Sequence, residues 1–490
     1  MQYWNNIINT AMLGTAKKPA DTHGLPQGPL LDAAMQILAT PALDREDQLL
    51  HIAAVTYNYR QSGVQALSST GTAPVPVCDP EDKPYCSSAA IKALQQALDT
   101  DNHILPGLWL EYCAAAQQLV PPDYLPLVLE TAYRHKALRV RAAACCGKRG
   151  EWLAQFNNEW NFSVVTTSLE DQWQNGTTAQ RLIALKTLRD KEPATALSWL
   201  RQTWTKENAA AKTELLGALQ HHIGPDDAPW LESLMLEKSK QVREEALLLL
   251  KKIPEASLHE LYLEVLRDAV QINDNGDIIC TLPENINEQV FRSGIEKLSS
   301  NKNVPDTDYI IGQLIGFVHP RVWEKHFNCS FEEVVQRFHQ QQALQPFIVA
   351  LVNAITWFSD HKRAATFMRY SDTFYMDLLP LLPEEQQEAY SLQYFDKYPT
   401  EILEYALQQP ATWSPELALK ILQYCAGNPY IYNQSYMSNT VGVLPVSMVD
   451  QLEGIESQHE NYKTYWKSIM MHLTGLLQTR ILITKAFPKS

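Results

Sequence analysis

Residues 193–254 read PATALSWLRQTWTKENAAAKTELLGALQHHIGPDDAPWLESLMLEKSKQVREEALLLLKKIP, and one pattern occurs in this stretch twice. The pattern is five residues long, with a basic residue in second place and a small or apolar residue in fifth place. It begins at Ala211 and at Val242, and a fainter copy begins at Gln180, so the period is 31 residues (211 − 180 and 242 − 211). Periods of about 20 to 50 residues are typical of solenoids, because each unit must stack on its neighbours to bury its apolar face.

The same part of the chain predicts a regular series of helices. They are expected near residues 178–189, 194–205, 208–221, 226–238, 240–252 and 256–269. The pairs Trp199-Leu200 and Trp230-Leu231 keep the 31-residue step. We therefore predict an all-α fold: an α-solenoid, a HEAT- or armadillo-like α–α superhelix, with an irregular helical C-terminal half. In such stacks we expect the basic residues of the pattern to brace neighbouring units through carboxylates.

Three regions are expected along the chain. They are an N-terminal helical region at 1–120 with a proline-rich insertion at 61–86, HEAT-like repeats at 121–270, and an irregular helical C-terminal region at 280–490. The prolines of the insertion cannot continue a helix. A turn at 273–277 precedes Ile278-Ile279-Cys280, which the sequence leaves open as a short strand or an extended link. A long helix over about 460–485 is expected to cap the array.

Composition narrows the class of protein. The chain has 490 residues, of which 45% are hydrophobic and 20% charged, as expected for a globular protein. Its net charge of −14 argues against bulk affinity for nucleic acid or an anionic membrane. The eight cysteines are few and lie mostly in apolar runs, which indicates reduced thiols. The longest strongly apolar run covers only residues 347–358, whereas a bilayer-spanning helix needs about 20 residues, so we expect a cytoplasmic protein.

The motifs of the common enzyme and metal classes are missing from the sequence. It has neither the phosphate-binding loop of nucleotide hydrolases nor the glycine fingerprint of dinucleotide-binding folds. His259-Glu260 lacks the second histidine of zinc proteases, and no Cys-x-x-Cys pair occurs. We therefore predict no cofactor, no metal and no enzymatic activity. Two alternatives stay open: an enzyme with scattered catalytic residues on a helical array, and a nucleic-acid-binding helical-repeat protein.

A basic segment at residues 134–149 is the first candidate for binding a partner. It holds no acidic residue, and its candidate partner-binding side chains are Arg134, Lys136, Arg139, Lys148 and Arg149. Such a cluster can form a patch for phosphate or for an acidic partner. The alternative is that these side chains brace adjacent repeats.

A tyrosine-rich segment is the second candidate. Residues 428–449 carry no charge, and we expect them to form an ordered loop that presents Tyr430, Tyr432 and Tyr436. Tyrosine is favoured at recognition surfaces, although it also pins loops down.

Several local sequences resemble known families. Residues 225–253 resemble the HEAT-like class of helical repeats. The sequences Gly147-Lys148-Arg149-Gly150-Glu151-Trp152-Leu153, Ser239-Lys240-Gln241-Val242-Arg243 and Leu13-Gly14-Thr15 look like those of an uncharacterised bacterial family known only as a domain of unknown function. The resemblance implies genes near those of MoxR-type AAA+ ATPases and von Willebrand A-domain proteins, and a role as an adaptor in such a complex. It implies no catalytic residues. The predicted function is therefore that of a non-enzymatic scaffold presenting a curved surface to another protein, with no membrane contact. The acidic net charge argues against nucleic acid as the partner.

Overall fold

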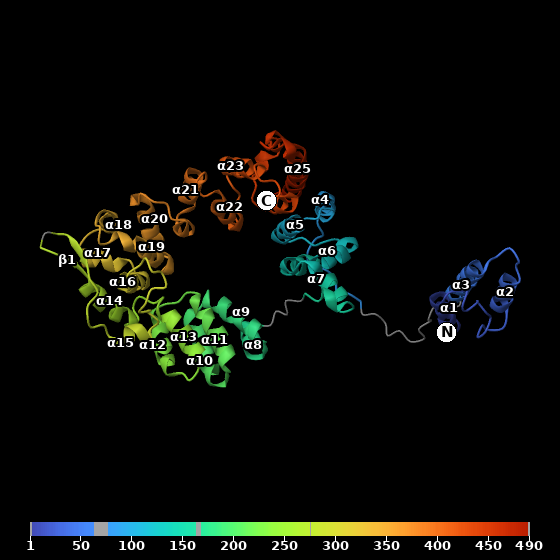
Figure 1. Cartoon of the computed structure of the whole chain (residues 1–490), viewed down its shortest axis with the longest axis horizontal. Helices are drawn as coiled ribbons and strands as arrows, with labels where there is room; N and C mark the ends of the chain where they lie inside the picture. Colours follow the sequence, from blue (N-terminus) through green and yellow to red (C-terminus); the bar gives the residue numbers. More distant parts are fainter. Residues whose placement is uncertain (1, 63–76, 163–167, 275, 489–490) are drawn as a thin grey trace. The chain divides into compact units, whose positions relative to one another are not determined.

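The computed structural model describes residues 2–62, 77–162, 168–274 and 276–488 (Figure 1). The chain divides into two compact units, Met1–Val77 and Cys78–Ser490. Regular structure in the described ranges is almost entirely helical, which confirms the all-α prediction. None of the helices in those ranges combines the length and the apolar character needed to cross a membrane.

The first unit is a small group of helices with its own core. It consists of α1 (Gln2–Leu13), α2 (Pro29–Leu38) and α3 (Arg45–Ser62). The buried side chains of this core are Tyr3, Ile7, Ala34, Leu49 and Ile52. Part of the proline-rich insertion expected at 61–86 follows, and its residues 63–76 lie outside the described residues.

The second unit holds the remaining helices and one hairpin. The first group is α4 (Ser88–Leu98), α5 (Ile104–Ala115), α6 (Leu125–Arg134) and α7 (Arg139–Ala154). The second group is α8 (Leu169–Asn175), α9 (Thr178–Arg189), α10 (Pro193–Thr203), α11 (Ala209–Leu216), α12 (Ala228–Ser233), α13 (Lys240–Leu250) and α14 (Ser257–Ala269). The third group is α15 (Glu288–Arg292), α16 (Asp306–Phe317), α17 (Arg321–Phe327), α18 (Phe331–Gln340), α19 (Ile348–Trp357), α20 (His361–Tyr370), α21 (Glu384–Tyr394), α22 (Pro399–Gln408), α23 (Pro415–Ala426), α24 (Gln434–Ser438) and α25 (Lys463–Ala486).

Short 3-10 turns join many of these helices. They are η1 (Pro122–Tyr124), η2 (Lys136–Leu138), η3 (Asn158–Trp160), η4 (Trp204–Lys206), η5 (Gly217–Gln220), η6 (Pro225–Asp227), η7 (Leu234–Leu236), η8 (Gln345–Phe347), η9 (Met376–Leu381), η10 (Asn439–Gly442), η11 (Val446–Met448), η12 (Leu452–Gly454) and η13 (Glu460–Tyr462). The helices expected at 208–221 and 226–238 are each an α-helix flanked by such turns. The other four helices expected over 178–269 are confirmed at nearly the predicted bounds.

Local sequence explains where these helices begin. Thr177 accepts a hydrogen bond from the backbone of Gln180, whose side chain bonds back to Thr177, so a reciprocal capping box starts α9. Pro193 opens α10, where its missing N–H costs nothing. The Asn208 side chain accepts from the backbone N–H of Ala211 and caps α11.

The segment after α14 is a hairpin rather than an extended link. Strands β1 (Val270–Ile272) and β2 (Ile278–Cys280) pair antiparallel, with Val270 opposite Cys280. The Asn273 side chain accepts from the backbone N–H of Asp277 at 2.8 Å. Gly276 has a φ of 83°, a conformation that L side chains rarely adopt, and this explains the glycine in the turn.

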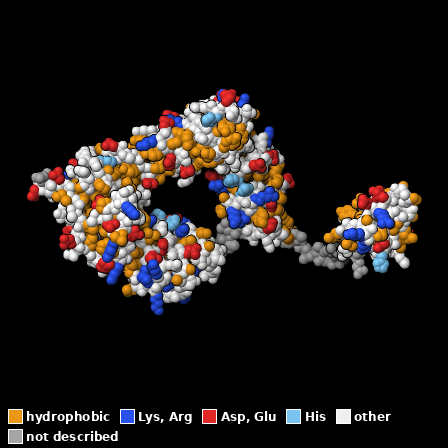
Figure 2. All heavy atoms as spheres, viewed as in Figure 1, with side chains coloured by type: hydrophobic (Ala, Val, Ile, Leu, Met, Phe, Trp, Pro, Cys, Tyr) orange, Lys and Arg blue, Asp and Glu red, His pale blue; other side chains and the backbone are white. Residues whose placement is uncertain are grey.

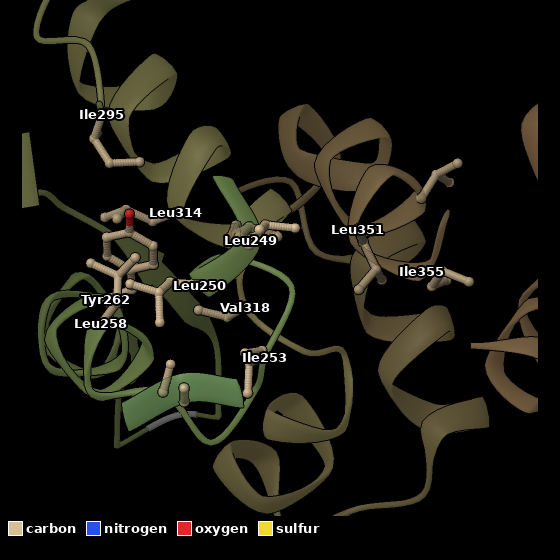
Figure 3. Close-up of a cluster of buried hydrophobic side chains, with 14 of the residues drawn as sticks. Leu249, Leu250, Ile253, Leu258, Tyr262, Ile295, Leu314, Val318, Leu351 and Ile355 are labelled. Carbon is tan, nitrogen blue, oxygen red and sulfur yellow. The ribbon is translucent and has the colours of Figure 1, made fainter. Parts of the chain in front are cut away.

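Two hydrophobic cores hold the second unit together. One is built from residues between Trp173 and Leu382, and Figure 3 shows the place where α13, α14, α16 and α19 contribute Leu249, Leu258, Leu314 and Leu351. The other combines residues 86–146 with residues 395–487.

Helix α25 joins the two halves of the second core. It packs against α4 and α5 (Figure 1). The rings of Trp109 and Phe487 meet edge to face at a centroid distance of 5.5 Å. The Asn102 side-chain amide donates to the Ser438 carbonyl at 2.7 Å. Helices α4–α7 therefore share their core with the C-terminal segment, whereas the sequence placed region boundaries near 120 and at 270–280.

The 31-residue register corresponds to a repeated side-chain contact. Arg181 pairs with Glu207 at 2.6 Å and lies over the Trp173 ring at 4.4 Å. One period later, Lys212 pairs with Glu237 at 2.8 Å and lies over the Trp204 ring at 4.9 Å. In both cases, the cation lies over a tryptophan that precedes it in the chain and pairs with a glutamate that follows it. The cation therefore links the two segments on either side of its own helix.

The third cation of the register behaves differently. Arg243 donates to the backbone carbonyls of Glu237 and Lys238, at 2.5 and 2.9 Å, and no carboxylate partner is found for it in the described ranges. All three side chains act as internal braces.

A buried ion pair ties consecutive units together. Arg189 is 1% exposed and binds both carboxylate oxygens of Asp227, at 3.0 and 2.8 Å. Its remaining donors reach the carbonyls of Pro193, Leu219, His221 and His222. A buried guanidinium costs little only when all of its donors are satisfied, as they are in this case.

The first prediction concerns this pair. Asp227→Ala should destabilise the second unit by about 3–5 kcal/mol, because it leaves a buried cation without its counter-charge. Thermal melting and limited proteolysis of the full chain measure the effect. The matched control is Asp226→Ala, which removes the exposed neighbouring carboxylate. Equal melting of both variants would contradict the role assigned to the pair.

The second prediction concerns pH. Hydrogen bonds from Arg181 and Lys212 lower the pKa of Glu207 and Glu237 respectively. A lowered folded-state pKa stabilises the protein above the unfolded-state pKa, about 4.3 for glutamate, and the contribution is lost as the pH falls through the folded-state value. The double variant Glu207→Gln, Glu237→Gln should melt lower at neutral pH and lose less stability on acidification than the parent. Parallel curves of melting temperature against pH for the two proteins would exclude this linkage.

Candidate partner-binding surface

The basic segment at 134–149 lies at the end of α6, on η2 and along α7. Figure 2 shows Lys and Arg side chains gathered over this part of the second unit. Arg134 pairs with Glu130 at 3.0 Å within α6. Neighbouring carboxylates thus neutralise part of the cluster.

Arg139 has a structural role. Its guanidinium donates to the carbonyls of Ala132 and Tyr133, at 3.3 and 3.0 Å, and lies 5.3 Å from the centroid of the Phe162 ring. Ala132 and Tyr133 lie in the last turn of α6, whose carbonyls lack partners within the helix. Arg139 therefore caps α6 and is not free to bind a partner.

The Gly-Lys-Arg sequence at 147–149 forms a docking site for residues 80–82 of the same chain. Helix α7 is interrupted at Gly147, where φ is 58° and ψ is −162°. The Glu81 carboxylate accepts from the backbone N–H groups of Lys148 and Arg149, each at 2.9 Å, so it caps the second half of the helix. A Cβ atom on Gly147 would lie 2.4 Å from Glu81, which explains why this position needs glycine.

Lys148 completes this internal contact. Its ammonium donates to the Pro80 carbonyl at 3.1 Å and to Asp82 at 2.9 Å. The hydrogen bond to Asp82 raises the pKa of Lys148. Within the described residues, no ion pair is found for the side chains of Lys136 and Arg149, so these two of the five basic candidates stay available. Lys136 is exposed and Arg149 is half-buried.

The tyrosine-rich segment at 428–449 is ordered and helical. It folds as α24, η10 and η11. Tyr432 is only 5% exposed, and its ring packs between those of Tyr424 and Tyr436 at centroid distances of 5.7 and 5.0 Å. Burial raises the pKa of Tyr432, and it raises the pKa of Tyr436 to about 12. Tyr432 therefore fixes the segment and is removed from the surface that a partner could reach.

Tyr430 is the member of the tyrosine set that faces solvent. It is 67% exposed, as is the adjacent Ile431. Its ring contacts Tyr462 at a centroid distance of 4.8 Å and Tyr465 at 6.2 Å. We call Tyr430, Ile431, Tyr462 and Tyr465 the Tyr430 group. The sequence predicted only Tyr430 among them, since the contact joins two distant segments.

Across the described part of the chain, no group of three or more His, Cys, Asp or Glu side chains is arranged to hold a metal ion. The basic segment and the Tyr430 group offer positive charge and contact surface.

These features define a mostly helical protein with internally braced units and a small exposed aromatic group. The chain belongs to a family of unknown function, DUF5691, whose model matches residues 6–487. The comparison with curated proteins and the comparison with solved structures each gave no match. The prediction of an uncharacterised family is thereby confirmed.

The third prediction concerns the Glu81 contact. Glu81→Ala should destabilise the second unit by about 0.5–2 kcal/mol, because two backbone N–H groups of α7 lose their cap. Proteolytic cleavage near residues 78–84 should become faster. Asp79→Ala, which removes an exposed carboxylate two residues away, serves as the control. Equal cleavage rates in the two variants would exclude the cap as the anchor of this segment.

Proposed function

We propose that this protein is a non-enzymatic, cytoplasmic scaffold or adaptor that binds another protein through the Tyr430 group. The observation that carries the proposal is the exposure of Tyr430 and Ile431, two consecutive large side chains that are each 67% exposed. Tyrosine is enriched among residues that dominate binding energy at interfaces. Tyr462 and Tyr465 hold the Tyr430 ring in place, so a partner would meet a surface ordered in advance.

We further propose that the braced units form a HEAT-like α-solenoid. The support is the recurrence of one contact after 31 residues, in which a cation covers a tryptophan and binds a carboxylate. Stacked repeats of this kind are built from nearest-neighbour interfaces and present extended binding surfaces.

The partner that we propose is a MoxR-type AAA+ ATPase or a von Willebrand A-domain protein. The support is the resemblance of residues 147–153 and 239–243 to the bacterial family described above. Lys136 and Arg149 would add positive charge to the contact with an acidic surface, which mainly increases the association rate.

The fourth prediction tests this function. Purified ATPases and von Willebrand A-domain proteins encoded near this gene are tested for direct binding by surface plasmon resonance. Tyr430→Ala with Ile431→Ala should weaken the complex by about 2 kcal/mol, roughly thirtyfold in Kd. Lys136→Glu with Arg149→Glu should lower the association rate and its dependence on salt.

Two controls separate binding from folding. Leu236→Ala removes an apolar side chain that is 91% exposed elsewhere in the second unit. Lys302→Glu reverses an exposed charge distant in sequence from the basic segment. Neither should alter affinity, and all variants should melt like the parent. Unchanged affinity of both double variants, or equal loss in the controls, would refute the proposed surface.

A further inference from the structure

A cavity of about 490 Å³ lies between α14 and α17. Its lining residues are distant in sequence from the Tyr430 group. This volume falls within the range of about 300–1,000 Å³ that is common for small-molecule sites. His259, His319 and His326 line it, together with Arg267, Arg321 and Lys325. We call it the histidine pocket. Its apolar wall includes Leu266 and Val318.

The charges around the histidine pocket are unevenly balanced. Arg267 pairs with Glu260 and Arg321 with Glu255, each at 2.8 Å. For Lys325, no ion pair is found in the part of the chain that the structure describes. Counting Glu255 with the lining residue Glu260, two carboxylates balance two of the three long cations, so the charge of Lys325 is left to attract an anion.

Two of the lining residues each carry a buried polar atom for which no hydrogen-bond partner is found among the described residues. These atoms are Nδ1 of His259 and Nε1 of Trp323, on side chains that are 3% and 2% exposed. Nε2 of His259 lies 3.3 Å from the Leu250 carbonyl, which can only accept, so this nitrogen carries the proton. Burial lowers the pKa of His259 to about 4, so the ring is neutral at neutral pH and Nδ1 is an acceptor. The indole N–H of Trp323 is a donor.

We propose that the histidine pocket binds a small organic anion that carries hydroxyl groups. The cation attracts the anionic group, either phosphate or carboxylate, and hydroxyl groups can donate to Nδ1 of His259 and accept from Nε1 of Trp323. Neighbouring side chains cover both nitrogens, so binding includes a shift of these side chains. The chemical class that fits is that of sugar phosphates and sugar acids.

The experiment uses the full chain labelled with ¹⁵N and observes its indole N–H signals, with the Trp323 signal assigned from Trp323→Phe. The probes at millimolar concentration are ribose 5-phosphate, gluconate, inorganic phosphate and ribose. Ribose 5-phosphate or gluconate should shift the Trp323 signal in a saturable way, and the stronger of the two identifies the anionic group. Inorganic phosphate and ribose should bind more weakly, since inorganic phosphate lacks the sugar hydroxyl groups and ribose lacks the anionic group.

Variants make the result specific to the pocket. Lys325→Glu should weaken binding of the sugar anion roughly tenfold, whereas Lys302→Glu should leave it unchanged. His259→Phe should remove the preference for the sugar anion over inorganic phosphate. If His259→Phe does not fold, the Lys325 and Lys302 pair decides alone. A Trp323 signal that stays fixed with every probe, or affinity that Lys325→Glu does not reduce, overturns the proposal.

Discussion

The buried guanidinium of Arg189 is the constraint on which the repeat region depends. It stands at the end of α9 and binds Asp227 in η6, so it connects one unit of the register to the next. Its other bonds reach the start of α10 and the turn after η5. A charge taken out of water is tolerated only where every donor is satisfied, so it permits one arrangement of these four elements. Apolar packing alone would permit many similar ones.

The helices of this region could be predicted from the sequence because the residues that determine where each helix begins and ends are neighbours in the chain. Helix bounds in 178–269 follow from capping residues, prolines and apolar spacing, all within a few residues of one another. The bracing role of Arg181 and Lys212 could also be predicted from the register. Their partners could not, because Glu207, Glu237 and the covered tryptophans lie outside the five-residue pattern.

The candidate surface was predicted only in part, for a physical reason. Composition showed that residues 134–149 are basic, yet it could not show that Glu81 and Asp82 dock on Lys148, since this contact spans more than 60 positions. The tyrosines at 430, 432 and 436 look alike in sequence. Their exposure differs because Tyr432 faces Tyr424 while Tyr430 faces outward. Whether a side chain is exposed or buried depends on contacts between distant segments, and the local sequence does not show these contacts.

The core shared by α4–α7 and the C-terminal segment has a consequence for synthesis. Helices of a domain generally form early as the chain leaves the ribosome, but α4 and α5 cannot cover their apolar faces until α25 has also emerged. Closing so long a loop slows folding, and the uncovered faces are prone to aggregation during that interval. The middle of the second unit has its own core and can fold first. Nascent chains of this protein should therefore depend on chaperones that hold the α4–α7 region until translation reaches α25.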